Sequence, residues 1–249
     1  PHDEREHEQH RVHQLAHREP DEQELERWKD IRLNWHISNG LDPKKLQFHQ
    51  HGPKELAHYA RAAFDIQYEF PFGWQEIEGL HHRSDYDLTQ HQKFSGKKLG
   101  VFDEATKSSY VPYIIETSAG CDRTVLTLLV NAYAEEAVNG EGEEGPRIVL
   151  KFAPHIAPIK ASIFPLMKKD GHPERAHKIY MELRRLWRVE LDESGSIGKR
   201  YRRADEIGVP FCITVDSEVG TVTVRERDSM KQVRISETEL MGYLKKSLN

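Results

Sequence analysis

The chain has 249 residues, 31% of them charged and 37% hydrophobic, and a formal net charge of −5. This length is enough for one sizeable core or for two domains. No run approaches the roughly 20 apolar residues of a membrane helix, and the sequence does not start like a secretion signal, so we expect a soluble, cytoplasmic protein without a membrane partner. The two cysteines, Cys121 and Cys212, fall in different predicted elements and are expected to be free, buried thiols.

The charge is distributed unevenly along the chain. From Arg147 onward there are 20 Lys and Arg against 14 Asp and Glu, a net charge of +6. Residues 1–146 hold 16 against 27, a net charge of −11. This asymmetry indicates that the C-terminal part contacts a polyanion and the N-terminal part does not.

Residues 1–20 are rich in histidine and poor in apolar side chains, which predicts a solvated segment that buries neither a strand nor a helix face. The alternative is a metal-binding array, because four histidines would share one face of a helix. These four are His7, His10, His13 and His17.

Helical periodicity predicts a helix over 21–37, where four apolar residues form one stripe, and a second helix over 54–64. Strands are predicted over 66–70 and 74–79. The strand period of two places Glu76 and Glu78 on one face, where neighbouring carboxylates are costly unless a cation lies between them. The alternative is a solvated face of an antiparallel sheet.

A strand, a tight turn and a helix follow one another over 111–133. Strands flank the hairpin-like connection 104–107, and the small residues 118–120 form the tight turn. In the helix, five apolar residues recur at three- and four-residue steps and are expected to pack on the sheet: Val125, Leu128, Leu129, Ala132 and Tyr133. Arg123 falls in the first helical turn, where a cation is favourable if an anion such as phosphate binds there. The alternative is an ordinary turn with a surface arginine.

The segment 135–146 is acidic, contains Gly and Asn, and lacks an apolar period, which predicts a linker and a domain boundary near Gly145. Residues 146–249 then alternate strands and helices, as in a small α/β domain with a mixed, mostly parallel sheet. Two polar clusters in this domain are candidate RNA contacts, the alternative being a solvated surface: Lys199, Arg200, Arg202 and Arg203 around Tyr201, and Arg225, Arg227, Asp228 and Gln232.

Four blocks of the sequence, taken in order, resemble the glycyl-tRNA synthetases of the dimeric, eukaryote-like type, which are class II aminoacyl-tRNA synthetases. The blocks are FPFGWQEIEGLHHRSDYDL, VPYIIETSAGCDR, DESGSIGKRYRRADEIGVPFCITVD and TVTVRERDSMKQVRI. The resemblance implies an α+β chain: part of a class II catalytic domain built on an antiparallel sheet over 1–145, and an anticodon-binding domain over 146–249.

The same resemblance implies site residues. Arg123 in IETSAGCDR corresponds to the arginine that lies against the ATP phosphates. Arg83 matches an arginine of the amino-acid pocket, where a guanidinium can hold a carboxylate bidentately. Glu116 and Ser118 match the residues that hold the glycine ammonium, and steric exclusion supplies specificity. Further candidates for ATP with Mg²⁺, or for glycine, are Glu76, Glu78 and Gly120. Residues 1–20 resemble an atypical second strand of motif 2, with histidines where apolar residues are expected.

The function implied is ATP-dependent activation of glycine and its transfer to glycine tRNA, with ATP, glycine and glycine tRNA as ligands and a homodimer as the family's assembly. Motif 1 and the first strand of motif 2 are not found in the sequence. We therefore expect little glycine-dependent ATP–pyrophosphate exchange by this chain alone. The alternative is a non-catalytic tRNA-binding or accessory protein derived from the synthetase.

Overall fold

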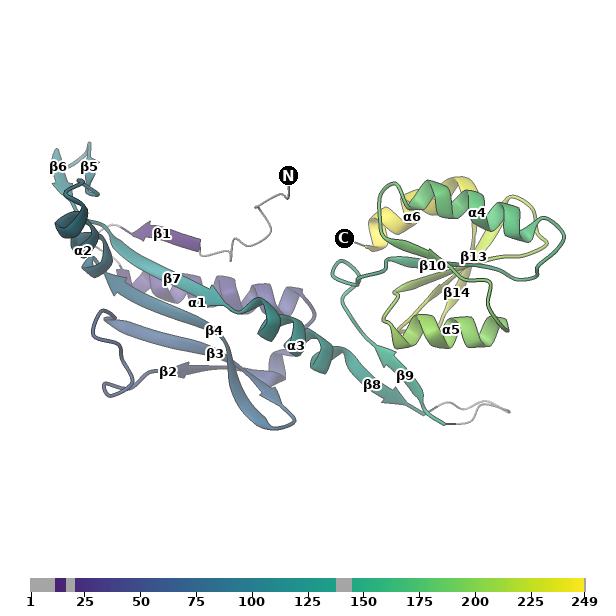
Figure 1. Cartoon of the computed structure of the whole chain (residues 1–249), viewed down its shortest axis with the longest axis horizontal. Helices are drawn as coiled ribbons and strands as arrows, with labels where there is room; N and C mark the ends of the chain where they lie inside the picture. Colours follow the sequence, from purple (N-terminus) through teal and green to yellow (C-terminus); the bar gives the residue numbers. More distant parts are fainter. Residues whose placement is uncertain (1–11, 17–20, 138–144, 249) are drawn as a thin grey trace. The chain divides into compact units, whose positions relative to one another are not determined.

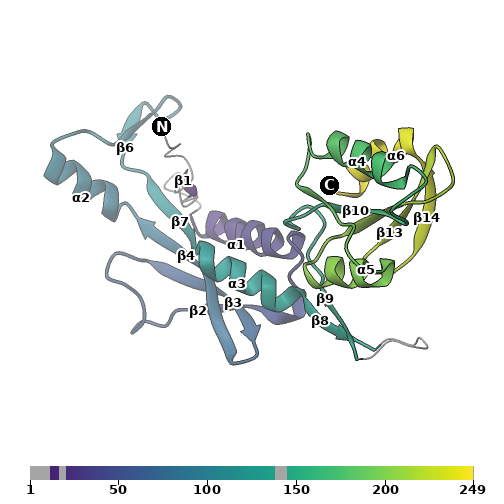
Figure 2. The ribbon, with the colours of Figure 1, turned by 45° about the vertical axis from the view of Figure 1, so that its right-hand side comes forward.

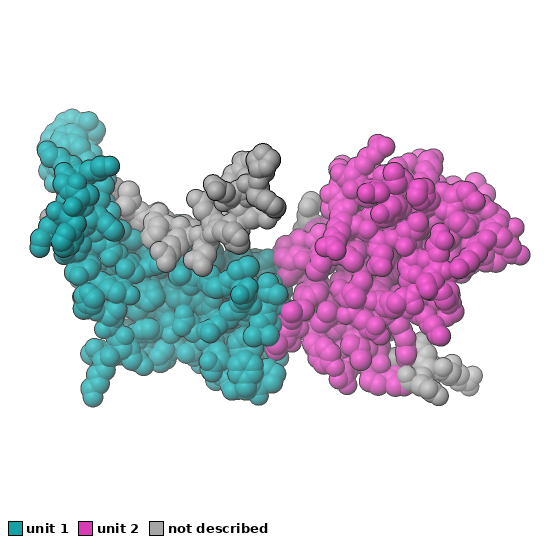
Figure 3. Space-filling view, viewed as in Figure 1, with its two compact units in different colours: residues 1–128 teal, residues 129–249 magenta. Residues whose placement is uncertain are grey.

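The computed structural model describes residues 12–16, 21–137 and 145–248 (Figure 1). The chain divides into two compact units, residues 1–128 and residues 129–249 (Figure 3). The domain boundary near Gly145 stays a prediction.

The first unit is built on a five-stranded, fully antiparallel sheet with the strand order β1-β7-β4-β3-β2. Its strands are β1 (Val12–Ala16), β2 (Leu46–Gln50), β3 (Ala62–Phe70), β4 (Gly73–Ser84) and β7 (Tyr113–Ala119). A short hairpin is formed by β5 (Val101–Asp103) and β6 (Ser108–Tyr110). The helices are α1 (Asp21–Ser38), the single 3-10 turn η2 (Pro43–Lys45), α2 (Tyr86–Ser95) and α3 (Cys121–Ala132).

Helices α1 and α3 lie on one face of this sheet (Figure 2). A small cavity between them is lined by Trp35 and His36 of α1, Ile77 of β4 and Thr127 of α3, which fixes the helices on the same side of the strands. Alternate strand residues point toward this side, and Leu80 is fully buried there. The other side chains of the strands are therefore left for a second, open face.

Residues 12–16 correct one expectation. They form β1, which pairs along its length with β7, although this segment was expected to be solvated. Backbone hydrogen bonds to a neighbouring strand can hold an edge strand that has few apolar side chains. The strand agrees with the family resemblance of this segment, while His7, His10 and His17 lie outside the described residues.

The helix predicted over 54–64 is wrong. Turns follow Pro53, and Ala63 and Phe64 belong to β3, where Phe64 pairs with Gln50 and Leu80 on the two neighbouring strands. The three- and four-residue spacing of apolar residues there was accidental. Tertiary pairing of the strand overrides such a weak local pattern.

The predicted apolar face of α3 is also wrong in part. Val125 is 50% exposed and Leu129 is 41% exposed, whereas Thr127 and Ala132 are buried. The Thr127 hydroxyl donates to the backbone carbonyl of Arg123 at 2.7 Å, so its polar group is satisfied inside the helix. Small inward residues bring α3 close to the sheet and leave the larger side chains outside.

The second unit contains a five-stranded mixed sheet with the order β11-β10-β12-β13-β14. Its strands are β10 (Ala161–Pro165), β11 (Val189–Leu191), β12 (Phe211–Val215), β13 (Thr221–Glu226) and β14 (Gln232–Ser236). A separate antiparallel pair consists of β8 (Tyr133–Glu136) and β9 (Arg147–Leu150). The helices are α4 (His172–Leu183), α5 (Ile197–Glu206) and α6 (Glu237–Ser247).

The mixed sheet confirms the predicted fold class, with one refinement. The pairs β10–β11 and β10–β12 are parallel, while β12–β13 and β13–β14 are antiparallel, so the sheet is half parallel and not mostly parallel. Short connections join the last three strands, and a short connection between neighbouring strands requires antiparallel pairing.

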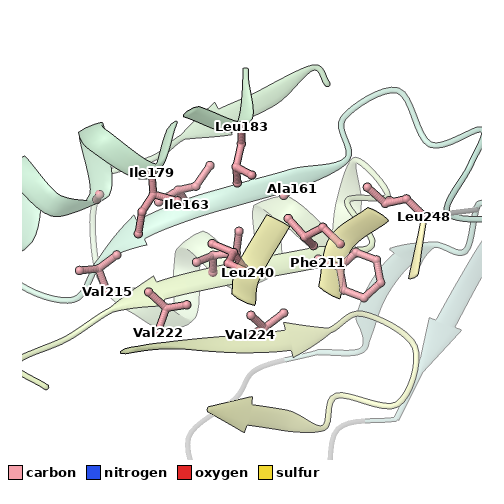
Figure 4. Packing of buried hydrophobic residues seen from close by; sticks show 13 residues of the cluster. Ala161, Ile163, Ile179, Leu183, Phe211, Val215, Val222, Val224, Leu240 and Leu248 are labelled. Carbon is pink, nitrogen blue, oxygen red and sulfur yellow. The ribbon is translucent and has the colours of Figure 1, made fainter. Parts of the chain in front are cut away.

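The core of this unit lies on the face of the sheet that carries α4 and α6 (Figure 4). Alternate residues of β12 and β13 point into it, among them Ile213, Val222 and Val224, against Leu183 of α4 and Leu240 of α6. The opposite face packs on α5, and Cys212 belongs to this smaller cluster. Burial raises the pKa of the Cys212 thiol to about 12.

No helix in the described part of the chain is long and apolar enough to cross a membrane. In the part of the chain that the structure describes, Cys121 and Cys212 are both free thiols, as predicted; Cys212 is buried as expected, whereas Cys121 is exposed, so its predicted burial is wrong.

Candidate functional site

Polar residues gather on the open face of the first sheet, across three neighbouring strands. Asp65, Gly79 and Ser118 are register partners on β3, β4 and β7. Two residues further along the same strands, His81 of β4 is the register partner of Glu116 of β7. Cross-strand partners have Cβ atoms about 4.5–5.5 Å apart, so these side chains form one patch. Because the apolar side chains of these strands point toward the helices, the polar ones point the opposite way. Residues that are far apart in the sequence are therefore neighbours on the open face.

Arg83 stands at one end of this patch and holds two carboxylates. Its Nη1 donates to Glu116 Oε2 at 2.5 Å, and its Nε donates to Asp87 Oδ2 at 2.5 Å. The guanidinium also lies over the Tyr59 ring, 4.1 Å from its centroid. The hydrogen bond to Asp87, together with the negative charge of Glu116, raises the pKa of Arg83 above its usual range, so it is a permanent cation here.

This geometry changes the role expected of Arg83. It is brought next to Glu116 as predicted, but the guanidinium already binds Glu116 and Asp87. A bidentate hold on one ligand carboxylate is therefore not the arrangement in this structure. The arginine instead fixes the direction of the Glu116 carboxylate beside Ser118.

Gly79 forms the floor between Ser118 and Asp65. A Cβ atom added there would lie 2.9 Å from Cε1 of His81 and 3.6 Å from Oε1 of Glu76. The His81 ring therefore leans over Gly79, in space that a side chain at position 79 would fill. Behind it, Nε2 of His51 lies 2.8 Å from Oδ2 of Asp65.

Glu76 and Glu78 do not act as the predicted pair. The register of β3 and β4 shifts at this point, with Gln67 opposite Glu76 and Ile66 opposite Glu78, which is a β-bulge at Ile77. The extra residue breaks the two-residue alternation, so Glu76 is exposed while Glu78 is buried under α1.

Glu78 is part of the fold. Arg32 Nε donates to its Oε1 at 2.6 Å, and His36 Nε2 lies 2.8 Å from its Oε2. Burial alone would raise the pKa of Glu78, but the hydrogen bonds from His36 and Arg32 outweigh it and the pKa is lowered. With both oxygens occupied by α1, Glu78 does not fit the role of a ligand for magnesium or an ammonium.

Arg123 lies in the first turn of α3, as predicted, and its side chain is exposed. Its Nη1 donates to the backbone carbonyl of Glu76 at 2.7 Å, which ties α3 to β4 beside the patch. An open depression at this helix end is lined by Gly120, Cys121, Asp122, Arg123 and Leu126. A helix N-terminus with a guanidinium suits an anionic group.

Within the described residues, no group of three or more His, Cys, Asp or Glu side chains could hold a metal ion. This agrees with the separation of Glu76 from Glu78. Magnesium would need oxygen ligands on one site, and Glu76 is the exposed carboxylate of the two.

The two basic clusters of the second unit separate into buried and exposed members, and three predicted RNA contacts are corrected. Arg200 is 3% exposed and donates to the carbonyls of Pro165 and Gly195. Arg225 binds both oxygens of Asp205. Arg227 is 1% exposed and donates to the carbonyls of Phe152 and Gly208. The N–H donors of these three arginines are bound inside the domain, so we do not assign the arginines to an RNA-binding surface.

The remaining members are more accessible. Lys199 and Arg203 are exposed on α5, Arg202 is half-buried, and Arg203 pairs with Asp192. Asp228 and Gln232 are exposed at the opposite end of the β13–β14 hairpin from α6. The buried face of α5 carries Arg200, Ala204 and Asp205, which turns the other cations outward.

Comparison with known proteins gives the same picture for both units. Residues 160–247 match the family model described as an anticodon binding domain. Over 230 residues the chain is 50% identical to a glycine–tRNA ligase of Treponema denticola, covering 90% of this chain and 51% of the relative. It is 52% identical over 224 residues to one of Borreliella burgdorferi, covering 88% of this chain and 50% of that protein.

A solved structure of prolyl-tRNA synthetase from Cryptosporidium parvum, complexed with L-proline and AMP, shares the fold with a TM-score of 0.60 at 17% identity. The match covers 91% of this chain and 47% of that one. The chain spans about half the length of the curated relatives it matches. Over nearly its whole length the chain is thus similar to about half of the length of these glycine–tRNA ligases, and its residues 160–247 match an anticodon-binding domain.

Proposed function

We propose that this chain supplies the glycine pocket and the tRNA-anticodon contacts of a glycine–tRNA ligase. One observation carries the proposal: Glu116, fixed by Arg83, stands next to Ser118 across a floor made by Gly79. An oriented carboxylate and a hydroxyl beside a glycine that the His81 ring covers leave room only for a small ligand with an ammonium group. The identity to glycine–tRNA ligases supports the same assignment.

In this proposal the Glu116 carboxylate accepts one hydrogen bond from the glycine ammonium, and the Ser118 hydroxyl oxygen accepts a second. Arg83 does not touch the ligand; it keeps Glu116 in place, because its own donors are bound to Glu116 and Asp87. Preformed orientation lowers the entropy lost when a small ligand binds.

Aminoacyl-tRNA synthetases as a class use ATP and Mg²⁺, and ATP supplies the adenylyl group and the pyrophosphate leaving group. Arg123 and the N–H groups that open α3 would hold a phosphate there. Gly120 leaves the backbone open at this helix end, since a Cβ there would meet nothing closer than 3.7 Å. Glu78 is not assigned to the magnesium ion, because Arg32 and His36 already bind its oxygens.

For tRNA we propose the outward side of α5, with Lys199, Arg202 and Arg203 near phosphates, and Asp228 and Gln232 near base edges. The domain match and the +6 charge from Arg147 onward support this. The homodimer and the cytoplasmic location stay predictions from the family.

The test is calorimetric titration of the whole chain with a non-hydrolysable glycyl-adenylate analogue. We expect binding, and we expect Glu116→Gln to weaken it at least tenfold, because hydrogen bonds to charged groups are worth about 1.5–3 kcal/mol. Glu104→Gln, an exposed carboxylate on the β5–β6 turn, is the matched control. No binding by the unaltered chain would reject the pocket.

Glycine-dependent ATP–pyrophosphate exchange separates the two classes of function. Exchange at about 1–10³ per second would mark a self-sufficient synthetase. A chain that binds glycine tRNA but neither the analogue nor ATP would instead be a tRNA-binding accessory protein.

A further inference from the structure

His81 has a position that the proposed pocket does not yet explain. Its ring leans over Gly79, with Cε1 2.9 Å and Nδ1 3.6 Å from the point where a Cβ of residue 79 would be. It is also the register partner of Glu116. The ring therefore covers the floor between the two residues that are proposed to hold the ammonium.

The position of the ring depends on glycine at 79. The contacts that a Cβ at 79 would meet within 4 Å are side-chain atoms of His81 and Glu76, and no backbone atom is among the three nearest. The backbone of Gly79 needs no left-handed conformation either. What excludes a side chain at position 79 is thus the ring of His81.

The ring is also incompletely satisfied. Nδ1 of His81 is buried and has no hydrogen-bond partner within the described residues. Charged and titratable groups face it from each packed element: Glu116 from β7, Asp65 from β3, Arg83 from β4, and His51 beyond β2. Burial lowers the pKa of His81, so the imidazole is neutral at neutral pH.

In the proposed pocket the α-carbon of a ligand is bonded to the ammonium that Glu116 and Ser118 hold, and the register partners of these two residues on β4 are His81 and Gly79. We propose that His81 is a specificity-determining residue of this pocket: its ring, seated on Gly79, occupies the space into which any side chain on the α-carbon would extend. The inference rests on the proposed glycine pocket. Every amino acid carries the same ammonium group, so carboxylates that bind it cannot distinguish glycine from larger amino acids. The inference assigns this discrimination, by steric exclusion, to His81.

The experiment compares glycyl- and alanyl-sulfamoyl adenosine by calorimetry with the whole chain. For the unaltered chain we expect the alanyl compound to bind at least tenfold more weakly. His81→Ala should reduce this ratio at least tenfold, mainly by tighter binding of the alanyl compound. A gain of affinity cannot come from general loss of structure. His91→Ala, an exposed histidine on α2, should leave the ratio unchanged.

A double-mutant cycle sharpens the test. Gly79→Ala alone should push the ring toward the ligand and weaken the glycyl compound, while Gly79→Ala with His81→Ala should restore it, because the added methyl then fills vacated space. An unchanged ratio in His81→Ala would overturn the inference and leave the glycine pocket standing. Failure of the unaltered chain to bind either compound would overturn both.

Discussion

Two arginine–carboxylate clusters of this protein use the same groups for different ends. On the open face of the first sheet, Arg83 holds Glu116 and Asp87, with side chains of 20%, 8% and 23% exposure. In the second unit, Asp205 binds Arg225 and Arg147, and their side chains are 2%, 9% and 6% exposed. The arginine and Asp87 of the first cluster are more exposed than any member of the second, in which both oxygens of Asp205 are bound by arginines.

The difference shows how a binding site is distinguished from a structural ion pair. Residue types alone cannot do this, since both clusters would be scored as basic and acidic residues near strand ends. What separates them is how far the side chains of each cluster are exposed to solvent. By that criterion the first cluster is a candidate site and the second is part of the core.

The strongest expected effect is at Asp205. Asp205→Ala leaves Arg225 and Arg147 buried with lost partners, so we expect a loss of about 3–5 kcal/mol in the free energy of unfolding. Urea unfolding followed by circular dichroism measures it. Asp228→Ala, which removes the exposed partner of Arg227, should cost less than about 1 kcal/mol. Equal losses in the two variants would end the distinction between core and surface pairs.

Glu78→Gln should cost about 2 kcal/mol, since hydrogen bonds from Arg32 lose their charged acceptor. The pKa of Glu78 is lowered from 4.5 in the folded state. Its stabilisation is therefore fully present above pH 4.5 and is lost as the pH falls through the lowered pKa. The stability difference between the two proteins should shrink on acidification, as measured by urea titrations from pH 7 to pH 3. A constant difference would contradict this.

Arg83→Lys should cost only about 1 kcal/mol in stability, because the cluster is partly exposed and lysine keeps the charge. Lysine cannot hold Glu116 and Asp87 with a planar fork, so affinity for the glycyl-adenylate analogue should fall at least tenfold. Calorimetry gives the affinity and thermal melting the stability. A variant in which stability falls but affinity does not would make Arg83 a purely structural residue.

Lys199→Glu should change stability by less than about 0.5 kcal/mol, because the side chain is exposed on α5. It should nevertheless weaken tRNA binding and reduce the slope of log affinity against log salt by about 0.7–0.9 if one phosphate contact is lost. Filter binding at about 50 to 200 mM salt tests this, because affinities that depend on phosphate contacts fall steeply over this range. Lys178→Glu, on helix α4 across the sheet, is the control. Equal slopes for both variants would reject α5 as the RNA side.

Much of the fold could be predicted from the sequence, because strong local patterns decide it. Helix α1, the strand–turn–helix at Arg123 and the alternation after residue 146 each appear as predicted, although Ile31 and Trp35 of the expected apolar stripe are 38% and 41% exposed. The helix predicted over 54–64 was wrong because the spacing of its apolar residues fits a helix as well as a strand. The prediction that Glu76 and Glu78 share one face failed because of the bulge at Ile77, and nothing in the local sequence marks which strand holds an additional residue.

The site could be predicted only where residues are close in sequence or matched by the family. Glu116, Ser118 and Arg123 share one segment. His81 and Asp65 come into the site through strand register, which the sequence does not display. Arg200, Arg225 and Arg227 were misjudged because an arginine whose donors meet backbone carbonyls inside the fold has the same local sequence signature as one that faces RNA.

The burial of Cys212 has a consequence for following the protein in solution. A thiol with a pKa near 12 is almost never a thiolate at neutral pH, and the thiolate is the form that reacts with alkylating and disulfide reagents. Cys121, exposed at the start of α3, is accessible without unfolding. The chain thus carries one fast and one slow labelling position, and the slow one reports how often the second unit opens around β12.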